Sequence, residues 1–163
     1  MKLLPIFLKE LQQEAEITRK FLTLIPEDKF DWAPHPKSMK MLRLAKHIAD
    51  LPAWPWMILE KDGLNFETST WKEDDVNSVE EILAYHTRSI EKGSNSINNS
   101  TEEELEKIWS LQAGGHIISQ DPKRDVMRMA LNQTVHHRAQ LGVYLRLLDI
   151  PIPGSYGPSA DEM

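Results

Sequence analysis

Three of the six histidines in this chain have neighbours that point to chemistry: His47, His136 and His137. His47 lies between Ala45 and Ile48 on an otherwise apolar segment, and His137 falls on the apolar face of the last helical segment. Neutral imidazole is the commonest metal ligand in proteins, and helix bundles build metal sites from side chains that project inward from facing helices. The pattern therefore predicts a histidine cluster, which is either a metal site or a set of structural, hydrogen-bonded imidazoles.

The step of four residues along a helix decides which side chains accompany His137. Residues four apart lie on the same helix face, and the residue four before His137 is Gln133 rather than a histidine. His136 and His137 point about 100° apart on a helix, so the two rings do not easily share one ion. The inner-face set is His47, Gln133 and His137. Glutamine offers a neutral carbonyl oxygen, which is a poor ligand for zinc or nickel.

The remaining histidines and the other reactive residue types give weaker signals. We expect His35 and His116 in loops and His86 in the middle of a helix, with surface or packing roles. The sequence contains no nucleophile elbow, phosphate-binding loop or dinucleotide-binding glycine motif. Because cysteine is absent, thiolate metal ligands, disulfides and a cysteine nucleophile are excluded.

Two tryptophans and an aspartate follow closely after His47. Trp54 and Trp56 are expected mainly as packing residues, with the wall of a pocket near His47 as the alternative. Asp50 is expected as a solvated carboxylate at the end of a helical segment, and its alternative role is to hydrogen-bond and orient a histidine.

Composition and charge limit the class of protein and the kind of partner. The chain has 163 residues, 40% of them hydrophobic and 27% charged, which fits one domain over residues 1–163 with a real core. Its net charge of −6 disfavours a nucleic-acid partner. The apolar run at the start ends at Lys9, and no apolar stretch of 18 residues occurs, so we expect no signal peptide, no membrane partner and a cytoplasmic location.

Four segments carry the three- and four-residue periodicity of amphipathic helices. They cover approximately residues 3–24, 38–61, 78–99 and 121–150. Pro52 and Pro55 each remove a helical hydrogen bond, so we expect a kink or break in the second segment.

Residues typical of helix starts precede three of these segments. Ser38 is the expected N-cap of the second helix. Ser78 and Glu81 form a capping box for the third. Asp121 is the expected N-cap of the fourth, with Pro122 at its first helical position.

The expected fold class is all-α, a four-helix bundle with long crossover connections at 62–77 and 100–122. Within the second connection, Trp109-Ser110-Leu111 and Ile117-Ile118 flank Gly114 and Gly115, which predicts a small β-hairpin between the third and fourth helices.

Two long parts of the chain resemble the DinB-like superfamily. The first comprises IPED at 25–28, Trp32, PHPKS at 34–38 and LAKHIADLP at 44–52. The second comprises VHHRAQL at 135–141, YLR at 144–146 and YGPSADE at 156–162. The resemblance covers nearly the whole chain in order, and the histidine–Arg–x–Gln–Leu element is its most specific part.

The resemblance implies a four-helix bundle with a long crossover, commonly a homodimer, and a central divalent metal, often nickel or zinc. In that family the ligands are one histidine on the second helix and two histidines four residues apart on the fourth. Carried over, His47 matches the first ligand and His137 the last, and the middle ligand falls on Gln133. Three alternatives follow for this position: His136 takes the place of the ligand, Gln133 binds weakly, or the site is metal-free. If the chain is an enzyme, His136 and Arg138 are the candidates for contact with a substrate.

Two functional hypotheses follow. The first is a metal-dependent enzyme of the DinB-like family, either a thiol S-transferase that uses a low-molecular-weight thiol or a hydrolase. The second, motivated by Gln133, is a non-catalytic relative that binds a small molecule or acts as a dimeric stress-response accessory.

Overall fold

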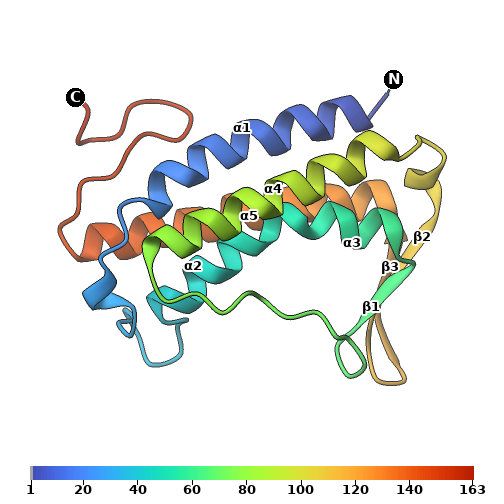
Figure 1. The fold of residues 1–163 in the computed structure, drawn as a ribbon, viewed down its shortest axis with the longest axis horizontal. Coiled ribbons are helices and arrows are strands. Elements are labelled where there is room, and N and C mark those ends of the chain that lie inside the picture. The colour runs from blue at the N-terminus through green and yellow to red at the C-terminus, as the bar shows by residue number, and fades with distance from the viewer. Residues whose placement is uncertain (1) are drawn as a thin grey trace.

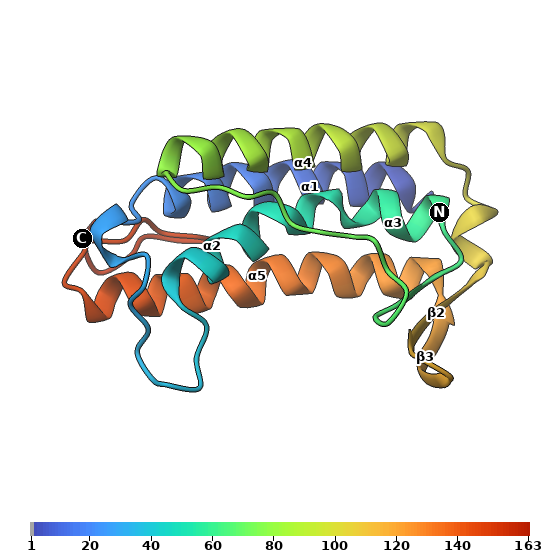
Figure 2. The same ribbon diagram turned by 60° about the horizontal axis from the view of Figure 1, so that its bottom comes forward.

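The computed structural model describes residues 2–163 and is mostly helical, with one small three-stranded sheet at one end (Figures 1 and 2). The α-helices are α1 (Leu4–Leu22), α2 (Met41–Asp50), α3 (Trp54–Glu60), α4 (Val79–Asn99) and α5 (Lys123–Leu147). Three short 3-10 helices are η1 (Glu27–Lys29), η2 (Leu51–Ala53) and η3 (Glu104–Glu106). The strands are β1 (Gly63–Asn65), β2 (Ile108–Ala113) and β3 (His116–Pro122).

The helices α2 and α3 together form the second helical segment, and the break between them is the one that the prolines predict. Pro52 lies in the 3-10 turn η2, and Pro55 lies in the first turn of α3. The segment continues in nearly the same direction after the break (Figure 2). Gly93 lets α4 pack closely there, because a Cβ at this position would lie 2.0 Å from the carbonyl oxygen of Pro52.

Of the three expected helix starts, only the one at Ser78 is confirmed, since its hydroxyl accepts the Glu81 N–H at 3.1 Å. The prediction of Ser38 as an N-cap is wrong, because α2 starts at Met41, whose N–H already donates to the Trp32 carbonyl. The prediction of Asp121 is also wrong. Asp121 pairs with Trp109 in the β2–β3 ladder, and Pro122 becomes the residue before α5.

The four helical segments lie side by side, with α1 and α5 running in one direction and α2–α3 and α4 in the other (Figure 1). Helix α1 contacts α4 and α5, and α2–α3 contacts the same two helices from the other side. Among residues 2–163, no helix is long and apolar enough to cross a membrane.

Only one of the two expected crossovers exists. The chain after β1 returns along the molecule, through residues 66–78, to start α4 beside the start of α2 (Figure 2). The second connection does not cross, because α4 ends and α5 begins at the same end (Figure 1). Residues 100–122 instead fold into η3, β2 and β3.

The sheet is larger than the predicted two-stranded hairpin. Strands β2 and β3 pair antiparallel around Gly114, whose φ of 59° is favourable for glycine. Strand β1, which no sequence pattern indicated, adds in parallel to β2, with Leu64 opposite Leu111. The prediction of a hairpin alone was therefore wrong, because it omitted a strand that lies more than 40 residues earlier in the chain.

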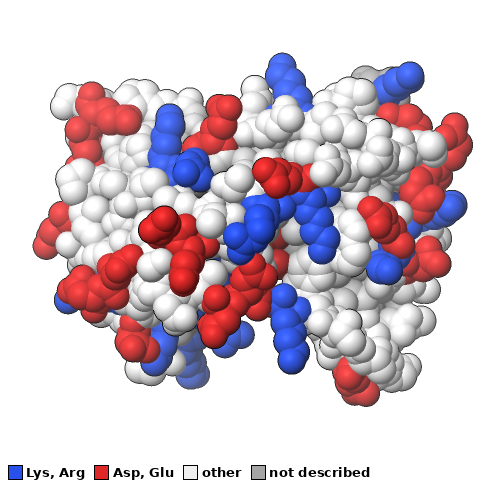
Figure 3. Space-filling view, viewed as in Figure 1, with Lys and Arg blue, Asp and Glu red and all other residues white. Residues whose placement is uncertain are grey.

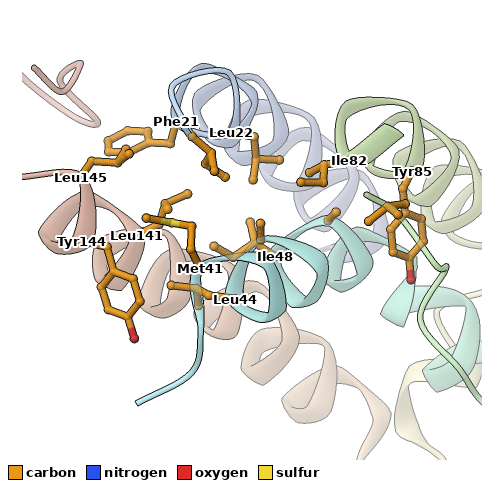
Figure 4. Packing of buried hydrophobic residues seen from close by; sticks show 14 residues of the cluster. Phe21, Leu22, Met41, Leu44, Ile48, Ile82, Tyr85, Leu141, Tyr144 and Leu145 are labelled. Atoms are coloured by element: carbon orange, nitrogen blue, oxygen red, sulfur yellow. The ribbon is translucent and has the colours of Figure 1, made fainter. Parts of the chain in front are cut away.

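Two clusters of buried apolar residues occupy the two halves of the helical layer. One joins the end of α1, α2, the start of α4 and the end of α5. Its members point toward one another in Figure 4, including Leu22, Met41, Ile48, Ile82 and Leu141. The other joins the start of α1, α3, the end of α4 and the start of α5 near the sheet. His47 and His137 lie near the middle of the molecule, where α2 contacts α5.

Candidate histidine centre and adjoining pocket

The contact between α2 and α5 brings the predicted histidines together. The ring centroids of His47 and His137 are 4.6 Å apart, and the ring planes are nearly perpendicular at 81°. The His136 ring lies 4.8 Å from that of His137, and the Trp54 ring lies 5.9 Å from that of His47.

Each ring of the central pair has a hydrogen-bond acceptor at Nδ1. The His47 Nδ1 lies 3.3 Å from Oε1 of Glu73, and the His137 Nδ1 lies 2.8 Å from Oε1 of Gln140. These acceptors favour the tautomer in which Nδ1 carries the proton, so the lone pair is on Nε2. No residue in 2–163 forms a hydrogen bond with either Nε2.

Gln140 also fixes the third ring. Its side-chain amide nitrogen lies 3.1 Å from Nε2 of His136, so the amide donates to that ring while its carbonyl accepts from His137. The Nε2 of His136 is therefore occupied, unlike that of the other two rings. The sequence analysis missed this role of Gln140, although its three- and four-residue spacing from His137 and His136 was a signal for it.

Burial chiefly lowers the pKa of His137, and the neighbouring imidazoles of His47 and His136 lower it further, against the opposing hydrogen bond to Gln140. Burial and the two imidazoles thus all disfavour a positive charge on His137. The neutral imidazole that results is the form that binds a metal ion.

The donor set fits a divalent ion held by two imidazoles. His47 and His137 each offer Nε2, and their Nδ1 contacts match the usual arrangement in which a metal-binding histidine donates its other N–H to a carboxylate or carbonyl. Within residues 2–163 no group of three His, Asp or Glu side chains is placed to hold an ion. Gln133, on the same face of α5 as His137, is the remaining protein oxygen of the predicted set.

A pocket of about 470 Å³ adjoins His47 and lies between α2–α3, the crossover, the sheet and α5. Most of its wall is apolar or aromatic, with Trp54, Met57, Ile58, Leu64, Phe66, Trp71, Trp109, Leu111, Val126 and Met129. Its polar lining is His47, Asp50, Ser69, Glu73 and Gln133. The pocket thus places a small-molecule volume against His47 and Gln133.

Asp50 lies beneath this pocket as a buried carboxylate, with 2% of its surface exposed. It accepts hydrogen bonds from Tyr85 Oη at 2.5 Å, Trp54 Nε1 at 2.9 Å and Trp71 Nε1 at 3.2 Å. Burial raises its pKa, the three hydrogen bonds oppose the shift, and the charge of Glu73 adds to it. The expectation of a solvated carboxylate was wrong, because Trp54, one helical turn away, and the distant Trp71 and Tyr85 cover Asp50.

Glu73 and Trp71 reach the pocket from the crossover, and the sequence analysis identified neither. This segment has no helical or strand periodicity, and so no pattern places its side chains. The pocket alternative holds for Trp54 but not for Trp56, which instead packs beside Trp71 with ring centroids 5.7 Å apart and lies under the ammonium of Lys92.

Arg138, a candidate for substrate contact, points away from the pocket into a buried cluster. Its Nη1 donates to Glu14 Oε2 at 2.6 Å and to Thr18 Oγ1 at 3.1 Å, and its Nη2 donates to Tyr156 Oη at 2.8 Å. The structure therefore brings His47, Gln133, His136 and His137 together and places Arg138 elsewhere. Of the remaining histidines, His35 and His116 are exposed and His86 is buried in α4.

Comparisons with known proteins give one consistent family. The model of the DinB family matches residues 2–163. The uncharacterised protein YrdA of Bacillus subtilis is 25% identical over 161 residues, which cover 96% of this chain and 89% of that protein.

Solved structures agree in fold. A DinB-like protein of Bacillus cereus matches with a TM-score of 0.69 and 25% identity, over 92% of this chain and 95% of that one. The DinB-like protein YjoA of Bacillus subtilis matches with a TM-score of 0.73 and 17% identity, over 91% and 96% of the two chains.

Proposed function

The chain belongs to the DinB family, and from this premise we propose that it is a metal-dependent enzyme acting on a small molecule in the pocket beside His47. His47 and His137 bind one divalent ion, nickel or zinc, with Gln133 as a weak third ligand. The reaction is thiol S-transfer with a low-molecular-weight thiol, or hydrolysis. In this proposal the four helical segments are the four-helix bundle of the family.

The observation that carries the proposal is the state of the two central rings. Both Nδ1 atoms have acceptors, both Nε2 atoms lack a partner within residues 2–163, and the ring centroids are 4.6 Å apart. Neither Nε2 is among the buried unpaired atoms of the described chain, so both are accessible from outside the fold. Two accessible imidazole nitrogens without a protein partner, on neighbouring rings, support an ion that keeps open coordination positions.

The residues around the rings have separate roles in this proposal. Glu73 and Gln140 hold the tautomers of His47 and His137 and keep Nε2 available. The apolar wall excludes water from the bound molecule. A divalent ion at such a site supplies a lowered pKa for a bound water or thiol.

Zinc and nickel titrations of the tag-free protein, followed by desalting and elemental analysis, test the proposal. We expect about one ion per chain, lost in His47→Ala and in His137→Ala. His116→Ala is the matched control, because it removes an exposed imidazole from β3 and leaves the pocket intact. Metal binding that persists in His47→Ala and His137→Ala contradicts the proposal.

One observation favours a second candidate, a non-catalytic relative that binds a small ligand or acts as a dimeric stress-response accessory. It is Gln133, which stands where the family pattern has a ligand and leaves residues 2–163 without a three-ligand group. This candidate predicts that Gln133→His creates tight metal binding that the natural protein lacks. Equal affinity in both proteins counts against it.

We further propose a cytoplasmic homodimer without nucleic-acid or membrane partners. The net charge of −6 supports the exclusion of nucleic acid. On the face shown in Figure 3, acidic and basic side chains are mixed over the helices rather than gathered into one basic surface. Light scattering during size-exclusion chromatography tests the dimer, and a monomer at micromolar concentration contradicts it.

A further inference from the structure

The charged residues of the pocket are all of one sign. Asp50 and Glu73 contribute carboxyl groups to its lining, and no lysine or arginine of the described chain is part of that lining. Three nearby cations, Lys72, Arg88 and Lys92, line instead a neighbouring cavity that shares Asp50 and Trp71 with this pocket. An anion in the pocket would therefore lose its hydration without gaining an opposite charge, which is unfavourable.

The aromatic wall adds a second reason for a positive ligand. Trp54, Trp71, Trp109 and Phe66 all line the pocket, and the faces of aromatic rings attract cations. The indole N–H groups of Trp54 and Trp71 both donate to Oδ2 of Asp50, which holds the two rings around one carboxylate. Trp71 already attracts a cation from outside, since the Lys92 ammonium lies 4.8 Å from its ring centroid.

An unpaired polar atom indicates that the wall is built for a ligand. Trp109 is 3% exposed, lines the pocket, and its Nε1 has no hydrogen-bond partner in the described chain. Buried indole N–H groups normally have a partner. The ring face of a bound aromatic group can accept this N–H.

We infer that the pocket selects a small apolar ammonium compound, of the arylalkylamine class, with the charge toward Glu73 and Asp50 and the apolar part among the indoles. This inference deepens the proposed function, because it names the class of molecule that the same pocket takes. Glu73 lies at Nδ1 of His47, whereas the ion of the proposed function would bind at Nε2. The two nitrogens point in different directions from the ring, so both sites are usable together.

Three probes of nearly equal size and different charge test the inference: 2-phenylethylamine, 2-phenylethanol and phenylacetate. Calorimetric titrations at pH 7 contain EDTA, so the amine cannot bind through a metal ion. We expect the amine to bind about tenfold more tightly than the alcohol, in the range of one cation–π or carboxylate contact, and phenylacetate to bind more weakly than both. Equal affinity for the amine and phenylacetate, or binding of none of the three, overturns the inference.

Two variants test whether Glu73 is the source of the preference for the amine over the alcohol. Glu73→Gln keeps the size of the side chain and removes its charge, so the amine should lose about tenfold in affinity and the alcohol should not change. Asp75→Asn is the matched control, because it removes a charge from the same segment at a side chain that is 92% exposed. Equal weakening of amine and alcohol in Glu73→Gln overturns the inference, since it would indicate a structural role.

The outcome is independent of the metal titrations above. Amine selectivity without metal binding leaves the inference standing and removes the metal-dependent enzyme. Metal binding without amine selectivity overturns the inference and leaves the metal-dependent enzyme standing.

Discussion

His137 and Arg138 are adjacent in sequence but lie in two different kinds of polar environment. His137 faces His47, and its Nε2 has no partner within the described chain. Arg138 points about 100° away around α5, toward α1. It is 2% exposed and donates to Glu14, Thr18 and Tyr156.

The difference separates a polar group that can bind from one that stabilises. The cluster around Arg138 is closed, because its cation, its carboxylate and its hydroxyls are paired with each other. The histidine centre is open, because the Nε2 atoms of His47 and His137 have no partner in the described chain and His47 lines a pocket. Substitutions in the closed cluster should therefore lower the free energy of unfolding, and those in the open centre should remove binding and leave stability nearly intact.

The largest loss of stability is expected from Arg138→Met. It leaves the carboxylate of Glu14, which is 8% exposed, without its cation, so the free energy of unfolding should fall by about 3–5 kcal/mol. Urea denaturation measures the loss. The double variant Glu14→Leu with Arg138→Met should recover much of it, because apolar residues often replace a buried ion pair without loss. If Arg138→Met alone is as stable as the natural protein, the cluster around Arg138 does not stabilise the fold, and the comparison is wrong.

The sequence predicted what local patterns determine. The four helical segments follow from periodicity, and the break follows from Pro52 and Pro55. The facing of His47 and His137 follows from each lying on the apolar face of its own helix. The two incorrect N-caps have a physical reason, since distant backbone carbonyls took the N–H groups that Ser38 and Asp121 were expected to serve.

Features that depend on distant partners could not be predicted. The side chain of Glu14 is 124 residues from that of Arg138 in the sequence, and nothing in VHHRAQL indicates which of its polar residues faces a carboxylate. Glu73 meets His47 from a segment without periodicity. Asp50 looked solvated because its three donors, at 54, 71 and 85, come from three different elements.

His86 sharpens the comparison, because its ring is unpaired but is not open to a ligand. It is fully buried, and neither ring nitrogen has a partner in the described chain. Burial, with a smaller contribution from the charge of Arg19, lowers its pKa from 6.5 to about 4. The unfolded chain therefore binds a proton that the folded chain does not, between pH 6.5 and 4.

Stability should consequently be complete above pH 6.5 and fall as the pH drops toward 4, with His86 contributing about 3 kcal/mol to the fall. In His86→Leu this part of the pH dependence should disappear, and the variant should gain on the natural protein at low pH. Urea denaturation at pH 7.5 and 4.5 measures both. His35→Leu, at an exposed position, is the control. Parallel pH profiles for the natural protein and His86→Leu contradict the prediction.

A smaller loss of stability is expected from Tyr156→Phe in the C-terminal segment. The hydroxyl of Tyr156 lies 2.9 Å and 3.0 Å from the two carboxylate oxygens of Glu14 and accepts from Arg138. Its removal leaves the ion pair in place and should cost about 1 kcal/mol. The Arg146–Asp161 pair should still hold the segment. A loss as large as that of Arg138→Met would mean that the hydroxyl, rather than the ion pair, closes the cluster.

The smallest effect on stability is expected from His47→Ala, the change with the largest expected effect on metal binding. The His47 side chain is 23% exposed and has one hydrogen bond, to a Glu73 side chain that is itself 31% exposed. Its removal leaves no buried charge unpaired, so the free energy of unfolding should fall by about 1 kcal/mol or less. Urea denaturation beside Arg138→Met gives the comparison directly. A loss of the size expected for Arg138→Met would place the histidine centre among the stabilising clusters, because only a ring on which the packing depends costs that much to remove.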